Sequence, residues 1–119
     1  MAFFTASTSI AAGSSFNPLE VTGNTWKYNR LPYDATVEIM HNATATGIVA
    51  TITSGSDEIM QEAPISAGAT AAVLPARLST EPVTFTGRAG DVIQPRYRNT
   101  SGGAITLNFT IEITRRVGA

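Results

Sequence analysis

Alternation of apolar and polar side chains is the strongest pattern in this chain, and it is clearest in residues 105–113. The odd positions of this segment carry Ile, Leu or Phe, and the even positions carry Thr, Asn or Glu. A period of two places one set of side chains on each face of a strand. The expected inner face consists of Ile105, Leu107, Phe109, Ile111 and Ile113. The expected outer face, turned to solvent or a partner, consists of Thr106, Asn108, Thr110 and Glu112.

Residues 91–98 alternate in the same way. The expected inner face carries Ile93, Pro95 and Tyr97, and the outer face carries Arg96 and Arg98. Pro95 has no N–H group to donate, so we expect this strand to lie at a sheet edge or to carry a bulge there. Residues 99–103, Asn-Thr-Ser-Gly-Gly, form a turn short enough for a hairpin between the two strands.

Further strands are expected at residues 3–10, 26–28, 37–40, 48–53 and 83–86. Gly, Asn and Pro recur between these segments at the spacing that a β-sandwich or barrel produces. The best helical segment, residues 67–78, is interrupted by Gly and Pro and is expected to cross irregularly. We therefore predict an all-β fold with little or no helix. We expect residues 1–119 to form one domain, a single antiparallel β-sandwich of roughly seven to nine strands.

Composition narrows the class of protein. The chain has 119 residues, 43% of them hydrophobic but only 14% charged, and its formal net charge is −1. The missing charge is replaced by 17 Thr, 17 Ala and 9 Ser. Such a surface suits a protein that lies against other proteins, and the charge balance makes a nucleic-acid partner unlikely on physical grounds. No apolar run is long enough for a membrane span, so no membrane partner is expected.

Catalytic chemistry finds little support. The single histidine, His41, has no recognisable nucleophile motif near it, and no Cys is present. We expect His41 to be a packed or surface side chain and the protein not to be an enzyme, with no catalytic residues and no cofactor. Asp57, Glu58 and Glu62 could offer oxygens to Ca²⁺, but they lack a calcium-loop spacing, and we expect a solvated loop and no metal site.

Two groups of side chains remain as contact candidates. Trp26, Tyr28, Tyr33 and His41 could stack on sugars, although large aromatic residues more often serve as core or interface anchors. Four arginines are expected to dock onto acidic side chains of a partner, because a planar guanidinium matches a carboxylate well. They are Arg96, Arg98, Arg115 and Arg116.

The N-terminal segment has its own signal. Residues 1–15 lack a basic start and an unbroken apolar run, so we expect mature protein rather than a signal peptide. Residues 3–10 carry no charge, although edge strands normally carry charge to prevent pairing with other chains. We therefore expect residues 1–12 to form an N-terminal strand or arm that contacts a neighbour, with Phe3 and Phe4 as anchors.

The C-terminal part resembles a known class of proteins. Three segments follow one another in a recognisable order: residues 87–93 (Gly-Arg-Ala-Gly-Asp-Val-Ile), residues 97–103 (Tyr-Arg-Asn-Thr-Ser-Gly-Gly) and the alternating residues 105–113. This part, residues 47–114, resembles the small β-sandwich proteins of tailed-bacteriophage virions, the jelly-roll capsid decoration or cement proteins above all.

The resemblance implies a jelly-roll fold and a structural role. Such a protein binds the major capsid protein at the capsid surface of the virion, stabilises the shell, and is present in the host cytoplasm during assembly. It also implies self-association, as a homotrimer. The alternative is a receptor- or glycan-binding module of the virion surface, in a head knob or tail fibre, with the aromatic side chains facing outward.

Overall fold

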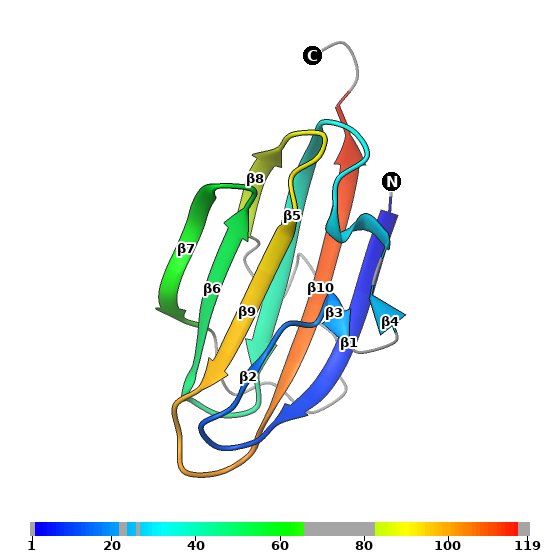
Figure 1. The fold of residues 1–119 in the computed structure, drawn as a ribbon. Helices are drawn as coiled ribbons and strands as arrows, with labels where there is room; N and C mark the ends of the chain where they lie inside the picture. The colour runs from blue at the N-terminus through cyan, green and yellow to red at the C-terminus, as the bar shows by residue number, and fades with distance from the viewer. Residues whose placement is uncertain (1, 22–23, 26, 66–82, 117–119) are drawn as a thin grey trace.

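Two stacked antiparallel sheets make up the molecule (Figure 1). The computed structural model describes residues 2–21, 24–25, 27–65 and 83–116. The first sheet, in spatial order, consists of β1 (Ala2–Ile10), β10 (Ile105–Arg115), β5 (Ala35–Ala43) and β8 (Val83–Gly87). The second consists of β2 (Ser15–Phe16), β9 (Ile93–Asn99), β6 (Ile48–Ser54) and β7 (Asp57–Pro64). Beside them, β3 (Glu20–Val21) pairs with β4 (Asn24–Thr25), and a 3₁₀ turn, η1, spans Lys27–Asn29.

The strand order is that of a jelly roll. When β3 and β4 are set aside and the described strands are counted along the chain, the two sheets have the orders 1-8-3-6 and 2-7-4-5. In this architecture eight strands pass between two sheets, and both sheets turn one face toward a shared core. The prediction of a single all-β sandwich with jelly-roll topology is confirmed. No helix among the described residues is long and apolar enough to cross a membrane.

The core lies between the two sheets and contains the side chains that the alternating sequence pattern predicted for the inner faces. The odd-numbered side chains of β10 from Ile105 to Ile113 are all buried, as predicted. On β9, Ile93 and Tyr97 are also buried, whereas Arg96 and Arg98 are exposed on the outer face. The period of two in the sequence therefore assigned the inner faces of both strands and the exposed outer face of β9 correctly.

The outer face of β10 differs from the expectation. Asn108 is as fully buried as Phe109, and Thr110 is 5% exposed. β10 pairs with β1 on one side and β5 on the other, so Asn108 lies between Ser7 and Asn42, and Thr110 lies opposite Met40, which is itself buried. The side chain of Asn108 accepts a hydrogen bond from Ser7 Oγ at 2.8 Å and donates one to Asn42 Oδ1 at 3.0 Å. Neighbouring polar side chains satisfy it there in place of solvent.

Pro95 occupies the kind of position that its chemistry requires. β9 lies between β6 and β2, but β2 pairs only with Tyr97 and Arg98. At Pro95 the strand therefore has a neighbour on the β6 side alone, where it lies opposite Ile52. A residue without an N–H group is tolerated because this part of β9 is in effect an edge.

Two local predictions are wrong, and one cannot be judged. Lys27 and Tyr28 belong to the turn η1 rather than to a strand, since this short segment carries little alternation and Asn29 and Pro32 end it. Asp57 and its neighbours form strand β7 rather than a solvated loop, because Gly55, at a φ of 61°, closes a tight hairpin with β6. Trp26 and the irregular crossing expected at residues 67–78 lie outside the described residues.

Asn99 joins three segments at the end of the sandwich where β1, β9 and β10 meet. Its side chain is fully buried. Nδ2 donates hydrogen bonds to the carbonyl oxygens of Ile10 and Gly103 at 2.9 and 2.8 Å. Oδ1 accepts from the N–H and the hydroxyl of Ser101 at 2.9 and 2.7 Å. One amide thus fixes the turn before β10 and ties it to the end of β1.

We predict that Asn99→Ala lowers the free energy of unfolding by about 3 kcal/mol, because the buried carbonyl group of Ile10 and the part-buried one of Gly103 lose their donor. Denaturant unfolding would measure it. Thr100→Val is the matched control, since the Thr100 hydroxyl makes a single exposed bond to the carbonyl oxygen of Gly47 at 2.8 Å. For this control we expect the free energy of unfolding to fall by less than about 1 kcal/mol. Equal losses in the two variants would contradict the role given to Asn99.

Candidate functional site

His41 belongs to the core and not to an open cleft. It lies on β5 and is 6% exposed. Its Nδ1 forms a 2.8 Å hydrogen bond with the hydroxyl of Tyr97 on the opposite sheet. The two rings meet edge to face with centroids 5.4 Å apart, and Tyr97 meets Phe109 in the same manner at 5.9 Å. The pair satisfies two polar groups between the sheets and helps to fix their spacing.

Burial determines the protonation of this pair. It lowers the pKa of His41 from 6.5 to about 4 and raises the pKa of Tyr97 well above 10, because each charged form would lose its hydration. Both side chains are therefore neutral near pH 7. A neutral imidazole bonded to a phenol inside the core is arranged for packing.

The described members of the proposed aromatic group, Tyr28, Tyr33 and His41, do not gather on one surface. Tyr28 and Tyr33 are half-buried and pack against the core cluster, while His41 points between the sheets. The ring of Tyr33 is instead covered by the guanidinium of Arg115, 5.4 Å from its centroid. This is a distance at which a cation is attracted to the face of a ring.

The acidic side chains of β7 are exposed. Asp57 and Glu58 lie at its start and Glu62 near its end. Among the described residues, no group of three His, Asp or Glu side chains is placed to hold a metal ion.

The four arginines lie in two places. Arg96 and Arg98 project from β9 on the outer face of the second sheet, whereas Arg115 and Arg116 follow one another at the end of β10 in the first sheet. The backbone N–H of Arg116 donates to the carbonyl oxygen of Asp34 at 2.9 Å. Arg98 pairs with Glu62. Within the described part of the chain, the guanidinium of Arg96 has no partner.

A shallow hollow lies beside Arg96. Its volume is about 110 Å³, and it is lined by Thr51, Thr53, Gln94 and Arg96. The register of the sheet explains the grouping, since Thr51 lies opposite Arg96 and Thr53 opposite Gln94. Two hydroxyls, an amide and a guanidinium therefore point outward from adjacent strands. We call this surface, made of Thr51, Thr53, Gln94 and Arg96, the β6/β9 face.

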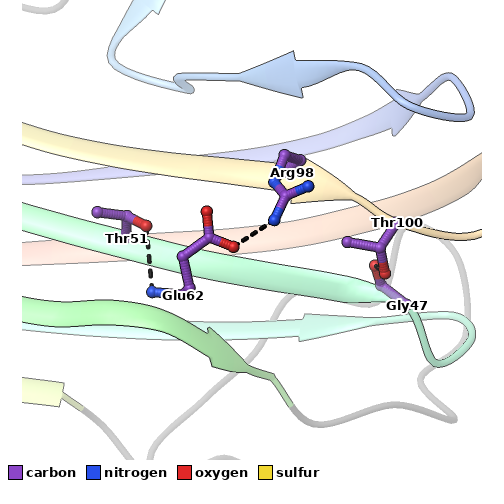
Figure 2. Close-up of polar contacts among 5 residues, drawn as sticks. All are labelled: Gly47, Thr51, Glu62, Arg98 and Thr100. Carbon is purple, nitrogen blue, oxygen red and sulfur yellow. Dashed lines mark hydrogen bonds and ion pairs between the residues drawn. The ribbon is translucent and has the colours of Figure 1, made fainter.

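Glu62 borders the β6/β9 face in an unusual backbone conformation. Its φ is 46°, which is uncommon for any residue other than glycine, and it lies within the first of the two register shifts between β6 and β7, between the pairs Ala50–Ala63 and Ile52–Met60. Its N–H donates to the hydroxyl of Thr51 at 3.2 Å, and its carboxylate reaches across β6 to Arg98 (Figure 2). The bulge thus turns Glu62 toward β9, where it pairs with Arg98 and leaves Arg96 available.

The N-terminal segment is a regular strand. β1 pairs with β10 along its whole length, from Ala2 opposite Ile113 to Ile10 opposite Ile105. Phe4 packs against the core cluster, so its ring already has a place in its own domain. Phe3 points to the other side and is 64% exposed, the one exposed large apolar side chain in the described ranges.

No protein-family model matches the chain, and no significant match was found among curated proteins or solved structures.

Sequence reasoning identified Arg96 and Arg98 but missed the residues around them. Val49, Thr51 and Thr53 alternate with buried Ile48, Ala50 and Ile52, so the parity of this strand already placed the two threonines on an outer face. Their position opposite Gln94 and Arg96 depends on which strands are neighbours, and no local signal gives that. The turned backbone at Glu62 likewise has no sequence signal.

His41 makes stability depend on pH. In the unfolded chain it is protonated below about pH 6.5, whereas in the fold it stays neutral until about pH 4. The unfolded state therefore binds more protons across this interval, and stability falls as the pH is lowered from 6.5 to 4. We expect a loss of about 2.5 kcal/mol at pH 4.5 relative to pH 7 from this group alone.

The measurement is denaturant unfolding of the protein and of His41→Gln at both pH values. The comparison removes the contribution of carboxylates, which both proteins share. The pH-dependent loss in His41→Gln should be smaller by about the amount given above. An identical loss in the two proteins would show that His41 is not a buried neutral group.

Glu62 allows a test of backbone strain. Glu62→Gly and Glu62→Val both remove the ion pair with Arg98, but only glycine adopts a positive φ without cost. We expect the Val variant to be less stable than the Gly variant by about 1–2 kcal/mol in thermal or denaturant unfolding. On an ordinary strand position valine is the better residue. A more stable Val variant would therefore exclude the turned conformation.

Proposed function

We propose that this protein is a structural virion protein that decorates a phage capsid and stabilises it by binding the major capsid protein shell. The observation that carries the proposal is the edge strand β1, which is nine residues long, uncharged and, among the strands that the structure describes, paired on one side only. An exposed edge of this kind aggregates unless it is covered. Coverage by a neighbouring protein fits a chain whose role is assembly.

The other sheet edges in the described part of the chain support the proposal by contrast. β2 has only two residues, and β8 has five. β7 carries Asp57, Glu58 and Glu62, ends at Pro64 and contains a bulge. Short length, charge, proline and bulges are the features that prevent pairing with other chains. β1 has none of them.

The proposed action is non-enzymatic and needs no cofactor. His41 is already engaged with Tyr97 inside the core, and binding would act through burial of surface. The partners are the shell and further copies of the protein; the resemblance to decoration proteins implies a trimer, whereas the free edge of β1 in the described structure suits the pairing of two copies. The place of action is the capsid surface, after assembly in the host cytoplasm.

The β6/β9 face is the proposed contact with the shell. Arg96 is exposed and without a partner in the described residues, so its guanidinium can bind a carboxylate of the shell through two parallel hydrogen bonds. An interface of ordinary size buries about 800 Å² on each partner, and the second sheet offers its outer surface for this.

A second candidate function is a glycan- or receptor-binding module on the virion surface. The hollow beside Arg96 favours it, because two hydroxyls, an amide and a guanidinium can each bond to sugar hydroxyls or an acidic sugar. Binding to oligosaccharides on an array, with no binding to capsids, would support this candidate over the first.

The test begins with purified virions from a culture that carries the gene, in which mass spectrometry should detect the chain. Recombinant full-length protein should then co-sediment with capsids that lack it. We predict that Arg96→Glu lowers the affinity for these capsids about tenfold or more, because the new carboxylate replaces attraction with repulsion.

Arg88→Glu is the matched control, since Arg88 is an exposed arginine on the turn between β8 and β9, away from the hollow. It should bind like the unaltered protein. Failure of the full-length protein to co-sediment would overturn the capsid function. Normal binding by Arg96→Glu would overturn the assignment of the β6/β9 face.

A further inference from the structure

The strand β1 is complementary in size to a reversed copy of itself. Its first half carries the two large side chains, Phe3 and Phe4, and its second half carries small ones from Ser7 to Ser9. Antiparallel pairing of two such strands places the large half of each against the small half of the other. Cross-strand pairs of an aromatic and a β-branched residue, such as Phe4 with Thr8, stabilise sheets.

We propose that two copies of this chain pair through β1, antiparallel, about a two-fold axis. The pairing joins two four-stranded sheets into one continuous eight-stranded sheet. This pairing identifies the neighbour that covers β1 as a second copy of the chain. Its biological purpose rests on the proposed function. The shell is then left to the β6/β9 face, which lies on the other sheet.

The geometry follows from the register. With Ala6 of both copies at the axis, Phe3 lies opposite Ser9 of the second copy and Phe4 lies opposite Thr8. Directly opposite side chains point to the same face of a sheet. The exposed ring of Phe3 can therefore lie over a small hydroxyl residue and lose much of its exposure, while Phe4 keeps its place at the core.

Charge also favours a second copy. β1 carries no charged side chain, so two identical strands meet without repulsion, and an acidic or basic partner strand would find no complement. The whole chain has a net charge of only −1, so long-range repulsion between copies is weak. A two-fold contact is self-complementary and closes after two copies, which prevents the open-ended pairing that a free edge invites.

Sedimentation equilibrium of the isolated full-length protein over a wide range of concentrations is the first test, and it needs no capsid. We expect a species with twice the 12.5 kDa chain mass. Thr5 lies near the middle of β1 on the outer face, close to its counterpart in the pair. Thr5→Lys and Thr5→Glu should each raise the dimer dissociation constant about tenfold or more. An equimolar mixture of the two should dimerise again.

Thr84→Lys is the matched control. Thr84 lies on β8, at the opposite edge of the same sheet and on the same outer face, and it is exposed. The dimer should survive this change. Circular dichroism and thermal unfolding of each variant would show that the sandwich is intact, so that a monomeric result reports on association.

Single cysteines read the register directly, because the chain has none of its own. Ala6→Cys should form a disulfide-linked dimer on mild oxidation, since residues directly opposite in a sheet are within disulfide range. If Thr5→Cys forms it instead, the axis moves by one residue and the pairing stands.

Three results would overturn the proposal: a monomer at every concentration, a trimer that persists in Thr5→Lys, or dimers equally unaffected by both Thr5 variants. None of them bears on capsid binding. Conversely, a dimer that fails to co-sediment with capsids would leave the β1 pairing in place and remove the proposed function.

Discussion

Backbone pairing of β10 with strands on both sides is the interaction on which the molecule depends. β10 forms nine residue pairs with β1 and nine with β5, the longest ladders in the described structure. These pairings join the first strand of the chain, the last and one from the middle. Such contacts are far apart in sequence, so none forms locally, and the sheet gains stability only when the chain has closed on itself.

The central position of β10 explains both the success and the failure of the sequence analysis. Its inner face is set by the period of two, and the pattern of Ile, Leu and Phe predicted it without knowledge of the neighbours. The outer face depends on what surrounds the strand. The buried Asn108 is hydrogen-bonded to Ser7 and Asn42, and these residues become its neighbours only through the strand order. Alternation alone carries no such information.

The candidate site shows the same division. The alternation of residues along β9 predicted that Arg96 and Arg98 share an outer face. It did not predict that, among the described residues, Arg98 is paired while Arg96 is not. Arg98 is paired because a bulge turns Glu62 toward it, and the bulge arises from a mismatch of register between β6 and β7. Strand β7 itself was missed because its charged start was interpreted as a loop. Edge strands tolerate such charge because one side of the ladder faces solvent, which weakens their alternation.

The edge of β1 cannot be explained by the demands of folding. On this strand Phe4 and Ile10 serve the core, whereas Thr5 and Ser9 lie on the outer face. A lysine at Ser9 would not disturb the core, and β7 shows that this chain does place charge on an edge. The absence of charge from β1, together with an exposed Phe3, is therefore a property of the surface rather than of the interior. A surface that lacks the usual protection along nine residues is best explained by a second strand that covers it.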